Sequence, residues 1–120
     1  MALILIVEDD IFIRQNAEWL VEDLGHEALT AGDLGEALEH LGADRPIDVL
    51  FVDIRLDTRP LGGYEVADHA IGIVPGLRVL YTSGSSLTQD MTNRFVGGGQ
   101  FLQKPYSLAQ LGQCVDTLLP

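Results

Sequence analysis

The chain has 120 residues, 47% of them hydrophobic and 21% charged, which suits one domain with a buried core. Its formal net charge of −11 argues against binding to nucleic acid or to an anionic membrane. No apolar run approaches the roughly 20 residues that cross a bilayer, and the first run, Ala2–Val7, is too short for a signal peptide. We therefore expect one cytoplasmic domain over residues 1–120, with no output domain.

Short apolar runs alternate with stretches of helical spacing along the whole chain. In chain order the pattern predicts a strand at Leu3–Val7, a helix at Ile11–Leu24, a strand at His26–Ala31, a helix at Leu34–Leu41, a strand at Ile47–Val52, a helix at Tyr64–Val74, a strand at Leu77–Tyr81, a helix at Leu87–Val96, a strand at Gln100–Gln103 and a helix at Ser107–Leu119. Strict alternation of this kind predicts an α/β fold, a doubly wound parallel sheet with helices on both faces.

Residues that favour helix ends and loops separate these elements. Asp10 and Asp33 are of the type that caps the start of a helix, and Gly25 and Gly42 follow the ends of the first two helices. The segment Asp57–Gly63 is predicted to be a long loop, because it contains a proline and two adjacent glycines.

Four of the apolar runs end abruptly on polar residues. Glu8 and Asp9 follow the first run, and Asp53 follows the third. Thr82 follows the fourth run, and Lys104, the only lysine of the chain, follows the last. Since α/β sheets place their chemistry just past the carboxyl ends of the strands, we expect these side chains to share one small space.

The chemistry of these five residues favours phosphoryl transfer. Clustered carboxylates repel one another unless a cation lies among them, and Mg²⁺ prefers such oxygen ligands. A threonine hydroxyl can donate to one phosphate oxygen, and a lysine can pair with another. An aspartate can itself act as the nucleophile and form an aspartyl-phosphate, which makes Asp53 the candidate acceptor.

Four segments together carry a resemblance to the response regulator receiver domains of two-component signalling, and it extends over the whole chain. They are LILIVEDD at 3–10, VLFVD at 49–53, VLYTSG at 79–84 and FLQKP at 101–105. The resemblance implies a flavodoxin-like sheet of five parallel strands in the order 2-1-3-4-5. It also implies a phosphoacceptor switch rather than an enzyme, one that supports only its own phosphotransfer and slow autodephosphorylation.

The resemblance assigns roles to the residues of the acidic site. It implies that Asp53 accepts a phosphoryl group from a histidine kinase or a histidine phosphotransfer protein. It implies that Mg²⁺ is bound by Asp9, by Asp53 and by the backbone carbonyl of Arg55, with Glu8 acting through water. Lys104 then matches the lysine that compensates the phosphoryl charge.

A second set of residues matches the switch of this family. Thr82 matches the hydroxyl that moves toward the phosphoryl group, and Phe101 matches the aromatic side chain that changes rotamer when it does. The bond between Lys104 and Pro105 matches a peptide that is often cis in these proteins. The changed surface is expected to bind a downstream protein partner.

The fourth helix, fifth strand and fifth helix form the face through which such domains usually signal. The candidate residues on it are mostly uncharged: Gln89, Asp90, Asn93, Arg94, Gln100, Tyr106, Gln110 and Gln113. We therefore expect a monomer or weak dimer. The sequence leaves open whether the chain is a phosphate shuttle, a regulator that binds a partner, or a receiver from a hybrid kinase.

Two other functional classes fit the same topology less well. A small phosphatase that uses an aspartyl-phosphate would carry a second aspartate two residues past the nucleophile, where this chain has Arg55. A flavodoxin-like electron carrier would need a phosphate-binding loop after the first strand, where Glu8, Asp9 and Asp10 would repel the FMN phosphate. The three histidines share no metal-ligand spacing, and Trp19 is expected in the core or an interface.

Overall fold

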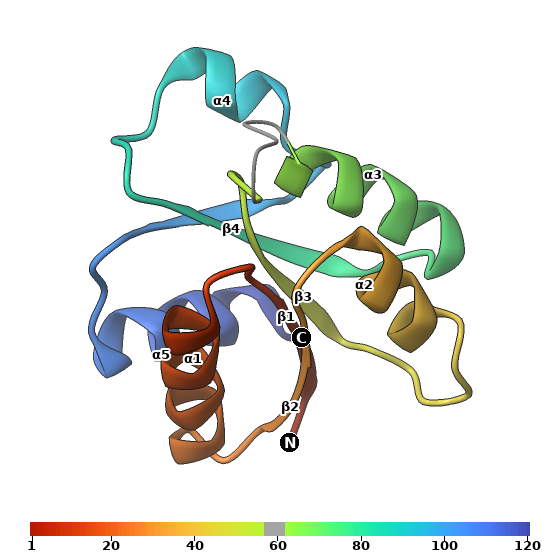
Figure 1. The fold of residues 1–120 in the computed structure, drawn as a ribbon. Coiled ribbons are helices and arrows are strands. Elements are labelled where there is room, and N and C mark those ends of the chain that lie inside the picture. Colours follow the sequence, from red (N-terminus) through yellow and green to blue (C-terminus); the bar gives the residue numbers. More distant parts are fainter. Residues whose placement is uncertain (57–61) are drawn as a thin grey trace.

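The computed structural model describes residues 1–56 and 62–120, and it has the predicted alternation of strands and helices (Figure 1). In chain order the elements are β1 (Leu3–Val7), α1 (Ile11–Asp23), β2 (Glu27–Ala31), α2 (Leu34–Leu41), β3 (Val49–Asp53), α3 (Gly62–Ile73), β4 (Arg78–Ser83), α4 (Gln89–Asn93), β5 (Gln100–Gln103) and α5 (Leu108–Leu118). No helix in these two ranges is long and apolar enough to cross a membrane.

The five strands form one parallel sheet in the order β2-β1-β3-β4-β5, which confirms the fold class and the strand order. Every residue of β1 and β3 is buried, as continuous apolar runs predict for the central strands of a parallel sheet. The register places Val7 opposite Val52, and Asp53 opposite Thr82. The carboxyl ends of β1, β3 and β4 therefore meet at one edge.

Successive side chains of each strand enter two different cores, because strand side chains alternate between the faces of a sheet. Leu3, Leu5 and Val7 of β1 belong to the core on one face, whereas Ile4 and Ile6 belong to the other. Figure 1 shows α1 and α5 side by side on one face, and α2 and α3 on the other. This double cover lets both faces of the sheet be apolar.

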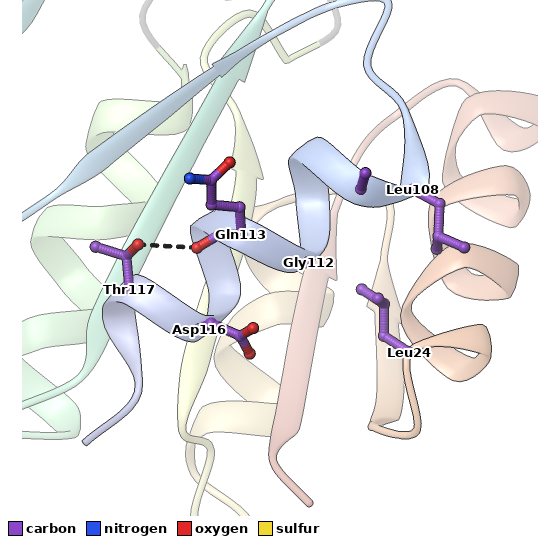
Figure 2. Close-up of a pocket in the computed structure, with 7 residues that line it drawn as sticks. Leu24, Leu108, Gly112, Gln113, Asp116 and Thr117 are labelled. Atoms are coloured by element: carbon purple, nitrogen blue, oxygen red, sulfur yellow. Dashed lines mark hydrogen bonds between the residues drawn. The ribbon is translucent and has the colours of Figure 1, made fainter.

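A close approach of α5 to the carboxyl end of α1 is possible because α5 has a glycine there. A Cβ on Gly112 would lie 3.0 Å from the Cδ2 of Leu24. An open groove lies over this junction, and Figure 2 shows residues of both helices around it, among them Leu24 and Leu108. Within α5, the Thr117 hydroxyl donates to the carbonyl of Gln113 at 2.8 Å.

Two strands, β3 and β4, end later than the apolar runs predicted. β3 spans Val49–Asp53 instead of Ile47–Val52, and β4 spans Arg78–Ser83 instead of Leu77–Tyr81. Asp53 and Thr82 are paired residues of the sheet, so they belong to the strands rather than to the loops after them. The reason is that the ladder of backbone hydrogen bonds continues past the last apolar side chain.

Two helix predictions need correction. The predicted loop Asp57–Gly63 lies outside the described residues at 57–61, but Gly62 and Gly63 form the first turn of α3. The helix predicted at Leu87–Val96 is only Gln89–Asn93. It begins later because the Thr88 side chain caps it by accepting from the amide of Met91.

Several smaller predictions have clear outcomes. Asp10 and Asp33 cap α1 and α2 as expected, and Gly25 follows α1 with a φ of +88° that suits glycine. The peptide between Lys104 and Pro105 is cis. Trp19 is 60% exposed, so it does not lie in the core, and its place in an interface stays a prediction.

Candidate functional site

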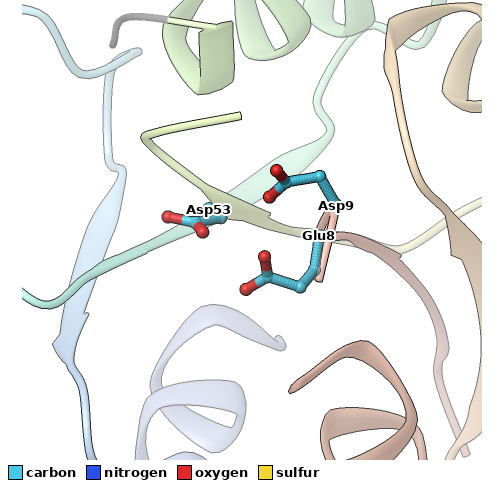
Figure 3. Close-up of side chains that lie close together, drawn as sticks. All are labelled: Glu8, Asp9 and Asp53. Atoms are coloured by element: carbon cyan, nitrogen blue, oxygen red, sulfur yellow. The ribbon is translucent and has the colours of Figure 1, made fainter. Parts of the chain in front are cut away.

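Three carboxylates gather at the carboxyl edge of the sheet. Glu8 and Asp9 come directly after β1, and Asp53 is the last residue of the neighbouring strand β3. Figure 3 shows the three side chains grouped at these strand ends. Each offers a carboxylate oxygen within 4.8 Å of the others, and Glu8 and Asp53 are buried while Asp9 is exposed.

The backbone around Glu8 is fixed by its neighbours in α1. The Arg14 guanidinium donates to the Glu8 carbonyl at 3.1 Å, and the Asp10 amide donates to the Glu8 carboxylate at 3.2 Å. The Asp10 carboxylate accepts from the amides of Phe12 and Ile13 at 2.9 and 3.1 Å. Asp10 therefore serves as the cap of α1, as the sequence predicted, and the turn after β1 is held in place.

Lys104 bridges the two buried carboxylates. Its Nζ lies 2.7 Å from Oε1 of Glu8 and 3.0 Å from Oδ2 of Asp53. The Lys104 side chain is 20% exposed, so its charge is partly shielded from water. A lysine in this position balances negative charge in the site and is placed to do the same for a group bound to Asp53.

Burial and mutual repulsion disturb the ionisation of this cluster. Burial raises the pKa of Glu8 to about 7, the Lys104 ammonium opposes that rise, and the Asp53 charge adds to it. Burial alone would lower the pKa of Lys104, but its bonds to Glu8 and Asp53 outweigh that effect and raise its pKa. In the absence of a bound cation, the cluster therefore favours a proton on Glu8.

Asp53 also accepts a hydrogen bond from the backbone. The Arg55 amide donates to Oδ1 of Asp53 at 3.2 Å, while Oδ2 faces Lys104. Arg55 lines the open hollow of about 440 Å³ in which Glu8, Asp9 and Lys104 also lie. The structure thus brings together the residues for which the family resemblance predicted contact with a metal or a phosphoryl group: Glu8, Asp9, Asp53, Arg55 and Lys104.

Of the two expected switch residues, Thr82 lies beside the acidic site and Phe101 does not. Thr82 is buried next to this site, and its hydroxyl donates to the Leu102 carbonyl at 2.7 Å. Phe101 lies away from the acidic site, because it packs into the core on the face that α2 and α3 cover. It contacts the ring of Phe95 there, with 6.3 Å between ring centroids.

Sequence reasoning missed Gly63 as a residue of the site. Its amide donates to the Ile54 carbonyl at 2.8 Å, and a Cβ on it would lie 2.6 Å from the Ile54 Cα. The first turn of α3 therefore packs directly against the backbone that carries Asp53. A glycine in a predicted loop gave no signal of this contact. Ser83, Gly84 and Ser85 complete the rim of the hollow.

The donor set suits a hard divalent cation. Carboxylate oxygens are the ligands that Mg²⁺ prefers, and it usually keeps several waters and binds through one or two carboxylates plus phosphate. Glu8, Asp9 and Asp53 present three such groups within reach of one another. The open hollow beside them leaves room for water and for phosphoryl oxygens.

The chain is similar to curated proteins over nearly its whole length. PilG of Pseudomonas aeruginosa is 28% identical over 122 residues, which cover 98% of this chain and 87% of PilG. The response regulator MprA of Mycobacterium tuberculosis is 30% identical over 117 residues, covering 97% of this chain and 50% of MprA. The chain thus spans about half the length of MprA.

Solved structures are similar to this chain over nearly its whole length. A response regulator receiver protein from Sinorhizobium medicae superposes with a TM-score of 0.85 at 28% identity, covering 98% of this chain and 93% of that one. The chemotaxis protein CheY4 of Vibrio cholerae has a TM-score of 0.86 at 24% identity, covers 99% of both chains and supports the fold alone. The family model of the response regulator receiver domain matches residues 4–116, so the chain belongs to this family.

Proposed function

We propose that the chain is a phosphoacceptor switch in which Asp53 receives a phosphoryl group from the phosphohistidine of a histidine kinase or of a histidine phosphotransfer protein. The observation that carries the proposal is the place of Asp53. It lies buried at the carboxyl edge of the sheet beside two further carboxylates, and the Lys104 ammonium, which also contacts Glu8, is 3.0 Å away. A nucleophile, a cation site and a fixed positive charge are thus within reach of one bound phosphoryl group.

The transfer would proceed by in-line displacement. A carboxylate oxygen of Asp53 attacks phosphorus, the bond between phosphorus and the donor imidazole nitrogen breaks, and the imidazole leaves with the electron pair. Glu8, Asp9, Asp53 and the carbonyl of Arg55 would hold Mg²⁺, which when bound offsets charge on the phosphoryl oxygens. Lys104 is placed to turn from the carboxylates to a phosphoryl oxygen and to pair with it as a point charge.

Signal output would begin at Thr82. To donate to a phosphoryl oxygen on Asp53, the Thr82 hydroxyl gives up its bond to the Leu102 carbonyl. Loss of this bond to β5 would be followed by a rotamer change of Phe101, which is in the same strand, and so by a change in the surface that a downstream protein reads. The chain would act in the cytoplasm as a monomer or weak dimer, as expected from its sequence.

A titration with beryllofluoride and Mg²⁺, followed by NMR, tests this proposal, because beryllofluoride on an aspartate imitates the acyl phosphate. Wild type should show saturable shifts at residues around Asp53, at Thr82 and at Phe101. The variant Asp53→Asn should show none, while the matched control Asp116→Asn, at an exposed carboxylate of α5, should respond like wild type. An unresponsive wild type, or a responsive Asp53→Asn, would overturn it.

Transfer from a phosphorylated donor gives a second test. Radiolabel from a histidine kinase should appear on the wild-type chain and on Asp116→Asn, but not on Asp53→Asn. Sustained turnover of an aryl phosphate would instead favour the phosphatase alternative. Arg55 stands against that outcome, because it occupies the position where a phosphatase would need its general acid.

A further inference from the structure

The helix α4 has little of its own to hold it to the sheet. In the described range Gln89–Asn93 no residue is fully buried, and Met91, which is partly buried, is the residue of this helix that packs against the core. The chain after it returns to β5 through a turn in which the Gly99 amide donates to the Val96 carbonyl at 2.9 Å. The segment Phe95–Gly99, just past the helix, therefore adds to what holds α4 to the sheet.

One residue of β4, Tyr81, contacts this segment in two ways. Its ring is fully buried and stacks on Phe95, with 4.2 Å between centroids and 12° between planes. Its hydroxyl accepts a hydrogen bond from the Val96 amide at 3.0 Å. A stacked pair adds to the apolar burial of both rings, and the hydroxyl satisfies a backbone donor just past the end of α4.

The last glycine before β5, Gly99, lies against the same ring. A Cβ on Gly99 would lie 2.9 Å from Cε2 of Tyr81, so a larger residue there would push against the buried ring. Gly98 has a φ of +79°, a conformation that other residues rarely adopt. The turn before β5 thus brings Gly99 against the ring of Tyr81.

Tyr81 and Phe95 are also next to Phe101. Tyr81 pairs with Phe101 in the register of β4 and β5, so their side chains leave the sheet on the same face. The Phe95 ring neighbours both of these rings. It stacks on Tyr81, and its centroid is 6.3 Å from that of Phe101, with 19° between the two ring planes. A rotamer change of Phe101 would therefore remove a neighbour of the ring through which Tyr81 holds the end of α4.

We propose that Tyr81 is a latch that fastens the segment Phe95–Gly99, and with it α4, to the sheet, and that the latch loosens when Phe101 turns. The first half stands on the resting structure alone, and the second half rests on the proposed function. In this chain the hydroxyl and the ring of Tyr81 then help to set how freely α4 moves, beside the packing of Met91 and the contact of Phe95 with Tyr64. Tyr81 is a positioning residue, since it touches neither Asp53 nor a bound group.

Amide hydrogen exchange at Val96 measures the latch directly in the unmodified protein. Tyr81→Phe keeps the ring stack and removes the hydroxyl, so exchange at Val96 should be about fivefold faster, the factor that one net hydrogen bond contributes. Tyr106→Phe is the matched control, because Tyr106 packs into the core on the opposite face of the sheet. Equal exchange at Val96 in the two variants and wild type would overturn the latch.

The second half is tested by repeating the exchange with Mg²⁺ and beryllofluoride. Faster exchange at Val96 in wild type, with little further gain in Tyr81→Phe, is the expected result. Shifts around Asp53 without any change at Val96 would overturn the coupling to Phe101 and leave the latch standing. Absence of any shift around Asp53 would instead count against the proposed function, and the resting-state comparison would still decide the latch.

Discussion

The Thr82 hydroxyl donates a 2.7 Å hydrogen bond to the carbonyl oxygen of Leu102, although Thr82 lies opposite Asp53 in the register of β3 and β4. The hydroxyl is therefore bonded to β5 and not to Asp53. Under the proposed function, a phosphoryl group on Asp53 would have to compete with this bond. Substitution of Thr82 removes the bond and so tests its role.

Replacing Thr82 by valine should separate phosphoryl acceptance from its transmission. The shape of the side chain is kept, and the loss of one buried hydrogen bond should lower the free energy of unfolding by about 1 kcal/mol. Beryllofluoride should still shift residues next to Asp53, but the shifts at Phe101 and Leu102 should be strongly reduced. Thr82→Ser, which keeps the hydroxyl, should retain them. A full response at Phe101 in the valine variant would contradict the role of the hydroxyl.

Removing the charge of Lys104 should weaken the fold and strengthen metal binding. Lys104→Met leaves Glu8 and Asp53 without their shared ammonium, so unfolding without Mg²⁺ should become easier by on the order of 2 kcal/mol. Mg²⁺ should bind more tightly, because a competing positive charge is gone. The matched control is Arg45→Met, which breaks an exposed ion pair with Glu27 and should cost less than about 1 kcal/mol.

Urea denaturation with and without Mg²⁺, together with calorimetric titration of the metal, measures both effects of the Lys104 substitution. Stabilisation by Mg²⁺ should be larger for Lys104→Met than for wild type or the control. Equal losses in the two variants, or weaker metal binding without the lysine, would show that Lys104 does not act as the balancing charge of this site.

The stability of the metal-free protein should depend on pH through Glu8. Burial raises its pKa to about 7 from the ordinary 4.5, so the folded protein binds this proton more tightly than the unfolded chain. The free energy of unfolding should therefore fall as pH rises from about 4.5 to 7 and level off above that. Urea denaturation across this range should show a smaller slope for Glu8→Gln than for Glu22→Gln, at an exposed residue of α1. The same slope in both would contradict the assignment to Glu8.

The alternation of strands and helices could be predicted because strands buried in a parallel sheet have a recognisable sequence pattern. β1 and β3 are buried on both faces, so their residues form continuous apolar runs. Polar residues after such runs then point to the carboxyl edge of the sheet, which is where the structure places Glu8, Asp53 and Lys104 together.

The boundaries that sequence reasoning placed wrongly depend on contacts between distant segments. α4 is short because Thr88 caps its start and the Val96 amide bonds to Tyr81, 15 residues earlier. Phe101 could be named as a switch residue only through the family resemblance. Its packing against Phe95 depends on a turn in which Gly99 lies against the ring of Tyr81 from another strand. Helical spacing and propensity hold no information of that kind.

The contact between Gly63 and the backbone next to Asp53 gives the sharpest prediction from geometry alone. Gly63→Ala should push α3 away from Ile54 or move Asp53, lowering the free energy of unfolding by about 1 to 3 kcal/mol and slowing phosphoryl acceptance. The matched control is Gly72→Ala, in the same helix, where a Cβ would meet nothing within 4 Å and alanine should be neutral or stabilise by about 0.5 to 1 kcal/mol. Thermal unfolding and acyl phosphate formation measure both variants. Similar behaviour of the two would show that helix propensity, and not the close approach to the acceptor strand, decides what α3 tolerates at its glycines.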